Sequence, residues 1–111
     1  MIVEIHGLEV IGTHGVKESE RREAQTLVFD VTLDVPEPAD DSIDATVDYR
    51  AVRDSVRETS GARSYHLLES LAVAAAEAIV RRFAVDEATV RVRKPGIDWA
   101  EWTAATASRT R

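Results

Sequence analysis

Alternating apolar and polar side chains in the segment 26–35 constrain the fold of this chain more than any other feature. Leu27, Phe29, Val31, Leu33 and Val35 share one side of an extended backbone. The other side carries mostly threonine and aspartate. Five successive apolar positions at a period of two are typical of a strand that buries one face and leaves the other in water. We therefore predict an antiparallel sheet that is covered on one side.

The N-terminal segment shows the same alternation with one interruption. Val3 and Ile5 lie on one face, Gly7 breaks the pattern, and Leu8 and Val10 resume it. This predicts a first strand with a β-bulge at the glycine. The connection to the next strand, over residues 13–24, is long and charged. Loops of this kind on small rigid sheets often carry function.

A first helix is predicted after an acidic, proline-containing surface loop at residues 36–46. Asp48 is placed to cap a helix that begins near Tyr49, because an aspartate side chain can accept a bond from the first turn. Tyr49, Val52 and Val56 recur at helical spacing and predict its buried face. The pair Ser60-Gly61 is predicted to end it.

A second helix is predicted after Ser64, which is a further candidate N-cap. Its apolar residues recur at spacings of three and four, and its many alanines favour helix formation. The residues of this apolar stripe are Leu68, Leu71, Ala72, Ala75 and Ile79.

Two strands are predicted to complete the chain. Val90 and Val92 alternate with polar neighbours over residues 88–93, and Pro95-Gly96 stops that strand because proline lacks a ladder donor. A fourth strand is predicted over residues 102–107. The resulting order, β-β-α-α-β-β, predicts an α+β fold with an antiparallel sheet and two helices on one face.

The composition excludes several classes of function. The 111 residues suit one domain, and a net charge of −6 argues against a nucleic-acid surface, where a basic patch is expected. There are no cysteines, which excludes thiolate chemistry and cysteine-ligated metals. No apolar run approaches the roughly 20 residues that span a bilayer, and the first residues lack the basic start of a signal peptide. We therefore expect a cytoplasmic protein with no membrane partner.

Metal and nucleotide sites lack their usual signatures in this chain. His6, His14 and His66 are its three histidines, and none pairs at the i, i+2 or i, i+4 spacing of a preformed imidazole site. No P-loop, Gly-x-Gly-x-x-Gly or Gly-x-Ser-x-Gly motif occurs. We therefore expect no metal. His14, beside Gly15 in the charged loop, is open to two interpretations: a substrate contact, or an exposed loop histidine.

Four further side chains could carry chemistry, namely Glu20, Tyr49, Glu69 and Lys94. Taken singly, each has an ordinary structural interpretation. A glutamate in a charged loop is usually solvated, and a tyrosine that opens a helix usually packs. A glutamate at a helix start can balance the helix dipole, and a lysine at a strand end is commonly an edge charge.

The segments around these four residues resemble those of bacterial dihydroneopterin aldolases. The matching pieces occur in the family's order and at its spacing, over about residues 5–96. Any one piece is weak, but six in register are specific. They are Gly7-Leu8, His14-Gly15-Val16, Glu20-Arg21 with Gln25, Thr46-Val47-Asp48-Tyr49, Leu67-Leu68-Glu69 and Lys94-Pro95.

The resemblance implies the tunnelling fold, which is a β-β-α-α-β-β unit, as one pterin-binding domain over residues 1–111. Family members join four units into a ring-shaped barrel through their sheets, and two rings stack into an octamer. We accordingly expect a homo-oligomer, either a tetrameric ring or an octamer. The resemblance also implies sites that lie between neighbouring subunits, which would explain how so short a chain builds a pocket.

The resemblance further implies an aldehyde-lyase of folate biosynthesis. Retro-aldol cleavage of 7,8-dihydroneopterin gives 6-hydroxymethyl-7,8-dihydropterin and glycolaldehyde. The substrate's own C6=N5 imine can hold the electrons that cleavage leaves, so neither a Schiff base nor a metal or other cofactor is required.

The resemblance assigns Glu69 as the pterin anchor, because a carboxylate can accept both the 2-amino group and N3–H of the ring in bidentate fashion. Backbone groups of Leu68 and Val47 are the matching candidates for further ring contacts. Lys94 would transfer a proton at the side-chain hydroxyl, Glu20 would bind that side chain or orient Lys94, and Tyr49 would stack on the ring or carry a proton.

The chain also departs from the family pattern. Ala24 stands where a glycine is common, and the segment 98–102 matches poorly. Trp99 and Trp102 in that region could pack against a neighbouring subunit or rim a pocket, and the packing interpretation is favoured because aromatic area dominates interfaces.

Other functions on the same scaffold stay open at this point. An epimerase of dihydroneopterin or its triphosphate would use the same intermediate, and a triphosphate would need a basic rim. Arg91 and Arg93 are candidates for that rim, although alternate strand positions favour a solvated face. A non-catalytic pterin- or purine-binding module would need Glu69 alone, whereas turnover needs Lys94 and Tyr49 as well.

Overall fold

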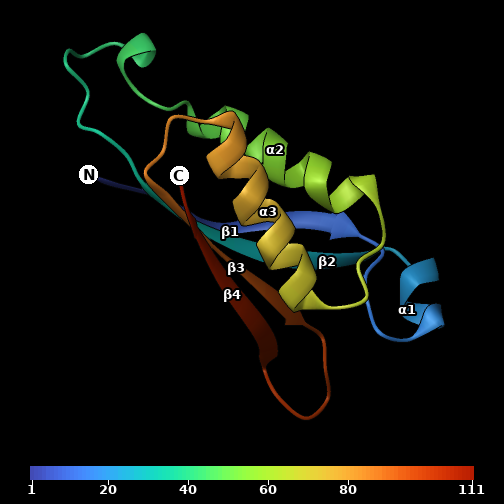
Figure 1. Ribbon diagram of the computed structural model, residues 1–111. Helices are drawn as coiled ribbons and strands as arrows, with labels where there is room; N and C mark the ends of the chain where they lie inside the picture. The colour runs from blue at the N-terminus through green and yellow to red at the C-terminus, as the bar shows by residue number, and fades with distance from the viewer.

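The computed structural model describes residues 1–111 and contains a four-stranded antiparallel sheet (Figure 1). Its strands are β1 (Ile2–Gly12), β2 (Gln25–Asp34), β3 (Glu87–Pro95) and β4 (Trp102–Thr110). They lie in the order β1-β2-β3-β4, so strands that follow each other in the chain are also hydrogen-bonded neighbours. All four predicted strands are confirmed, and the last one runs further than the predicted end at residue 107.

Two helices, α2 (Tyr49–Ala62) and α3 (Leu68–Arg82), cross one face of the sheet and leave the other face uncovered (Figure 1). A short helix, α1 (Glu18–Arg22), lies in the β1–β2 connection, and a 3-10 turn, η1 (Ile43–Ala45), lies in the β2–α2 connection. The predicted α+β order is confirmed. Helix α1 is an addition, since the charged segment 13–24 has no apolar stripe that would predict it.

The alternation in β2 builds the core. Leu27, Phe29, Val31 and Leu33 are completely buried, in one cluster with the apolar stripes of α2 and α3. Each side chain of this kind stabilises the fold by roughly 1.5–3 kcal/mol on burial, so the period-two pattern decides which sheet face the helices cover. The helical side of the cluster comprises Val52, Val56, Leu71, Ala72, Ala75, Ala76 and Ile79.

The predicted bulge in β1 is present. The β1–β2 register shifts between Ile5 and Leu8, and Gly7 adopts a φ of 70° that favours glycine. The Gly7 N–H, which has left the ladder, donates to Asp30 Oδ1 at 2.9 Å. The bulge therefore keeps its backbone donor satisfied while Leu8 returns to the covered face.

The helix ends correct three predictions. Helix α2 continues to Ala62, just past the predicted end, and Tyr49 at its start is 56% exposed and does not join the buried stripe. Ser64 does not cap α3, which begins after Leu67 without a side-chain cap. The Ser64 hydroxyl instead contacts the Thr13 hydroxyl at 2.8 Å, because this segment is tied to the β1–β2 connection.

The uncovered face carries the two arginines of β3. The guanidinium groups of Arg91 and Arg93 lie 4.5 Å and 5.6 Å from the ring of Trp102. Arg93 also donates to both carboxylate oxygens of Asp30, at 2.9 Å and 3.2 Å. Lys94 is the next residue and points to the opposite face, so Arg91 and Arg93 lie on the uncovered face, as the alternate strand positions favoured, and not beside Lys94 of the same chain. Trp99 is 76% exposed in the β3–β4 connection.

Both outer strands have one unpaired edge. β1 pairs only with β2, and β4 pairs only with β3. Unpaired edges present a row of free backbone donors and acceptors that can add another strand. None of the helices is long and apolar enough to cross a bilayer.

Candidate active site

The residues predicted to act in the site, except His14, lie in two separate surface hollows. The first, the Lys94 hollow, brings together Glu20, Leu68, Glu69 and Lys94. Its remaining lining residues are Gly15, Val16, His66, Leu67 and Thr103. The second, the Tyr49 hollow, contains Val47 and Tyr49, together with Val3, Ile43, Thr46, Asp48 and Arg50.

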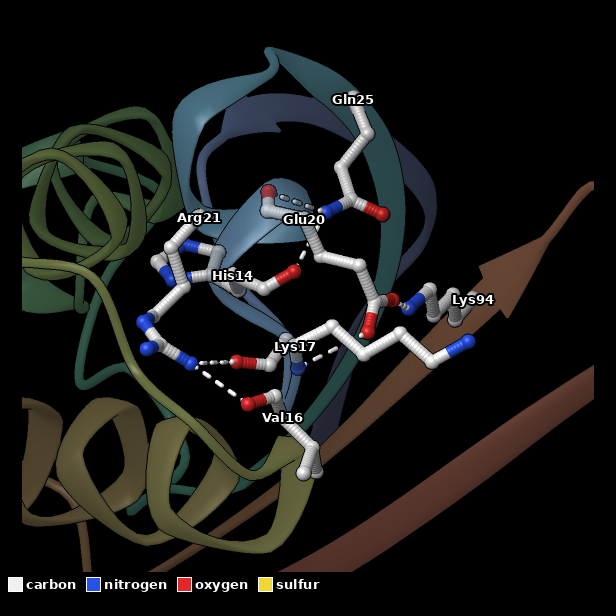
Figure 2. A network of polar contacts seen from close by, with 8 residues as sticks. His14, Val16, Lys17, Glu20, Arg21, Gln25 and Lys94 are labelled. Carbon is white, nitrogen blue, oxygen red and sulfur yellow. Dashed lines mark hydrogen bonds and ion pairs between the residues drawn. The ribbon is translucent and has the colours of Figure 1, made fainter.

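Helix α1 and the turn before it hold Glu20 in the Lys94 hollow through short-range contacts (Figure 2). The Lys17 N–H donates to Glu20 Oε1 at 3.2 Å. Arg21 donates to the carbonyls of Gly15 and Val16 at 2.9 Å and 2.6 Å, which closes the turn. The Gln25 side-chain amide, at the start of β2, donates to the carbonyl of His14 and, at 3.4 Å, to that of Glu20. The charged β1–β2 connection is therefore ordered, and it holds the Glu20 side chain in place.

Glu20 and Lys94 form the central pair of the hollow. The Lys94 ammonium donates to Glu20 Oε2, although 74 residues separate the two in the chain. Both side chains are partly shielded, with 29% of Glu20 and 21% of Lys94 exposed. The bond from Lys94, and after it the bond from the Lys17 N–H, lower the pKa of Glu20. Glu20 is thus held as a carboxylate beside the Lys94 ammonium.

His14 lies behind this pair and lines neither hollow. Its side chain is 2% exposed, so the interpretation as an exposed loop histidine is wrong. Nδ1 accepts the Tyr65 N–H at 2.9 Å, which places the ring proton on Nε2, where it is shared with Ser60 Oγ at 2.9 Å. Burial lowers the pKa of His14, and the bond to Ser60 acts the other way to a smaller extent. Both ring nitrogens are occupied, which does not fit the expected direct contact with substrate.

Gly15 allows the turn to pack tightly against Glu20. Its φ is 155°, and a Cβ added there would lie 2.5 Å from the Cβ of Glu20. The Gly15 N–H donates to the Tyr65 carbonyl at 2.9 Å. A glycine at this position therefore links the β1–α1 turn to the α2–α3 connection and leaves room for the glutamate.

The start of α3 carries Leu68 and Glu69, which are expected to bind the pterin ring. Glu69 lies in the first turn and Leu68 is the first residue of the helix. The N–H groups of a first turn have no partner within the helix, and no side chain caps this one. A carboxylate and free backbone donors thus lie side by side, which suits a ring edge that offers both donors and acceptors.

The Tyr49 hollow lies at the other end of α2. Asp48 caps that helix as predicted, with Oδ1 accepting the Arg50 N–H at 2.9 Å. From Tyr49 to Ser60, which contacts His14, the helix rises about 17 Å. Figure 1 shows the start of α2 and the green 3-10 turn η1 at one end of the molecule, and α1 at the other. Tyr49 and Lys94 of one chain therefore do not meet.

Sequence reasoning missed two residues of the Lys94 hollow. His66 was counted only as a possible metal ligand, and Thr103 lay in a segment with little pattern. The register that pairs Lys94 with Thr103 across β3 and β4 places this hydroxyl beside the lysine. Nothing local in the sequence signals that register. No three histidine, aspartate or glutamate side chains of the chain are grouped so that they could hold a metal ion.

Relatives of known identity share the sequence over most of its length. The model of the FolB dihydroneopterin aldolase family matches residues 3–107. A dihydroneopterin aldolase of Streptomyces coelicolor is 34% identical over 96 residues, which cover 84% of this chain and 81% of the relative. One of Methylorubrum extorquens is 33% identical over 95 residues, covering 82% and 73%.

The fold also matches that of a solved dihydroneopterin aldolase. The crystal structure of E. coli dihydroneopterin aldolase in complex with neopterin matches with a TM-score of 0.92 at 26% identity, over 98% of each chain. The sheet order and the two helices on one face are therefore features of a shared architecture. The chain belongs to the dihydroneopterin aldolase family.

Proposed function

We propose that the active site of this dihydroneopterin aldolase forms where the Lys94 hollow of one copy meets the Tyr49 hollow of a neighbour. The observation that carries this is the division of the predicted residues between two ends of the chain. The hollows measure about 180 Å³ and 220 Å³. Each is below the roughly 300–1,000 Å³ of a typical small-molecule pocket, whereas the two together fall within that range.

The surfaces around the two hollows support such an assembly. Val16 and Leu67 are 69% and 44% exposed beside the Lys94 hollow, and Ile43 and Tyr49 are 55% and 56% exposed at the Tyr49 hollow. Large exposed apolar side chains gathered at a site mark a contact surface. Pairing of the free β1 edge of one copy with the free β4 edge of the next would extend the sheet into a tetrameric ring. Two such rings could stack into an octamer. We expect this assembly in the cytoplasm.

The substrate is 7,8-dihydroneopterin, and its ring binds at the start of α3. The Glu69 carboxylate accepts the 2-amino group and N3–H in bidentate fashion, and the backbone of Leu68 contacts the same edge. The neighbour contributes the backbone of Val47 and the ring of Tyr49 as a stacking surface. This arrangement directs the C6 side chain toward Glu20 and Lys94.

The reaction is a retro-aldol cleavage in folate biosynthesis. Lys94, oriented by Glu20 and in its neutral amine form, takes the proton from the hydroxyl on the second side-chain carbon, either directly or through a water molecule. The bond between the first and second carbons breaks, its electrons move into the C6=N5 imine, and glycolaldehyde leaves. A proton delivered to the first carbon, by way of Tyr49, gives 6-hydroxymethyl-7,8-dihydropterin. Lys94 acts as a proton carrier rather than a Schiff-base nucleophile.

A first experiment tests the activity. The purified chain is mixed with 7,8-dihydroneopterin in the presence of a chelator, and glycolaldehyde release is followed. We expect release that the chelator does not affect. Tight pterin binding without release would instead indicate a binding module.

A second experiment tests the shared site. Lys94→Ala and Tyr49→Ala chains, each impaired, are dissociated, mixed in equal amounts and reassembled. About one quarter of the interfaces then combine two intact hollows, so activity should reappear. The matched control mixes Lys94→Ala with Glu69→Ala, which damage the same hollow, and should regain nothing. Equal recovery in both mixtures, or none in either, would contradict a site shared between copies.

A further inference from the structure

The Lys94 hollow contains a histidine that the proposed reaction does not use. His66 lines the hollow with Glu20, Glu69 and Lys94, and its side chain is exposed. It has no hydrogen-bond or ion-pair partner, whereas His14 is bonded at both nitrogens and His6 lies near Glu4 at 3.4 Å. An imidazole that faces a ligand site without a protein partner has both a donor and an acceptor free.

The backbone places His66 at the Glu20 end of the hollow. The preceding residue, Tyr65, accepts the Gly15 N–H through its carbonyl at 2.9 Å and donates its own N–H to His14 at 2.9 Å. Gly15 in turn packs directly against Glu20. His66 therefore extends from a fixed point beside the Glu20–Lys94 pair, while Glu69 lies three residues further on, in the first turn of α3.

Among the other polar groups of the hollow, Lys94 contacts the hydroxyl on the second side-chain carbon in the proposed reaction, and the terminal hydroxyl has no assigned contact. Glu69 is assigned to the pterin edge, and Glu20 and Lys94 bind each other. Thr103 is only partly exposed and lies beside Lys94 in the β3–β4 register. The walls formed by Val16 and Leu67 are apolar. The side chain of dihydroneopterin bears three hydroxyl groups, and the two outer ones leave as glycolaldehyde.

We propose that His66 is a specificity-determining residue that binds the outer hydroxyl groups of the substrate's side chain, and so selects pterins with a polyol tail. This rests on the proposed function, because it takes the ring to lie at Glu69 and the tail at Lys94. A neutral imidazole can accept from one hydroxyl and donate to the next, which matches two hydroxyls on adjacent carbons.

The test compares two ligands that differ only in the tail. His66→Ala is made in the Lys94→Ala background, where the tail is not cleaved, and dissociation constants are measured for 7,8-dihydroneopterin and for 6-hydroxymethyl-7,8-dihydropterin. We expect the first to bind about five- to ten-fold more weakly, as for the loss of one or two neutral hydrogen bonds, and the second to bind unchanged. His66→Gln, which retains a donor and an acceptor, should recover most of the loss.

His6→Ala in the same background is the matched control, since it removes an exposed histidine from the uncovered face, and it should change neither constant. Equal weakening of both ligands by His66→Ala would show that His66 acts on the ring or on the fold. No change for either ligand would show that it makes no contact. Both results would overturn this proposal. If the Lys94→Ala chain bound neither pterin, the proposed function itself would be wrong.

Discussion

The two hollows differ in how their residues are held. In the Lys94 hollow, contacts between segments far apart in the chain fix Glu20, Gly15 and the loop before α3. In the Tyr49 hollow, the polar contacts are local, such as the Asp48 cap, and the Tyr49 side chain reaches into solvent. One hollow is organised by the fold of a single chain, whereas the other presents a surface that a neighbour would complete.

This difference predicts which substitutions should have effects that depend on protein concentration. A change in the Lys94 hollow should act through the geometry of one chain, and its effect should be the same at any protein concentration. A change in the Tyr49 hollow should act through the contact between copies, so dilution should worsen it. The following substitutions are ordered from the largest expected effect to the smallest.

Lys94→Ala should have the largest effect. Removal of a positioned proton-transfer group lowers turnover by about 10²–10⁴-fold, while the contacts of the ring at Glu69 are untouched. We therefore expect kcat to fall by about 10³-fold with nearly unchanged pterin affinity, measured by glycolaldehyde release and by titration. Arg91→Ala, which removes a cation from the uncovered face of the same strand, should leave both quantities unchanged. A loss of affinity larger than the loss of kcat would contradict the assigned role.

Gly15→Ala should have the next largest effect, because it disturbs the turn that packs against Glu20. The new Cβ would meet Glu20 and force its carboxylate away from Lys94. Misplacement of a catalytic group by about 1 Å can cost about 10²-fold, so we expect a fall in kcat of that order with the fold retained. Gly61→Ala, in α2, meets no atom within 4 Å and should leave kcat unaltered. Wild-type turnover in Gly15→Ala would show that the Glu20–Lys94 geometry is not critical.

Glu69→Ala should act on binding. Hydrogen bonds to a charged partner contribute about 1.5–3 kcal/mol, which corresponds to roughly a 10- to 100-fold weaker dissociation constant for the pterin. Turnover at saturating substrate should change less than affinity does. Calorimetric titration with the product 6-hydroxymethyl-7,8-dihydropterin measures this dissociation constant for a pterin that lacks the outer carbons of the substrate's side chain. Unchanged affinity would show that a group of the hollow other than Glu69 binds the pterin ring.

The fold could be predicted further than the site, and particular residues show why. The period of two in β2 and the glycine that interrupts β1 are local patterns, and local patterns predict strands and bulges. The burial of His14 depends on Tyr65 and Ser60, which lie 51 and 46 residues away in the chain. The pairing of Glu20 with Lys94 spans 74 residues. No periodicity encodes such contacts, so only the resemblance to a family could indicate them, and it did not indicate that His14 is enclosed.

The smallest expected effect is on the pH dependence of the free energy of unfolding, and it comes from His14. Burial lowers the pKa of His14, so below the ordinary value of about 6.5 the unfolded chain takes up a proton that the folded chain does not. The free energy of unfolding should therefore be flat above about pH 6.5 and fall, by at most about 1.4 kcal/mol per pH unit from this group, as the pH decreases below it. Denaturant titrations between pH 7.5 and 5 measure this slope.

His14→Asn should reduce that slope, because its amide oxygen can accept the Tyr65 N–H and does not titrate. It should also lower the free energy of unfolding at pH 7.5 by about 1–3 kcal/mol, since the contact with Ser60 is lost. An unchanged slope in His14→Asn would mean that His14 is accessible to protons in the folded chain, and the Lys94 hollow would then be as loosely held as the Tyr49 hollow.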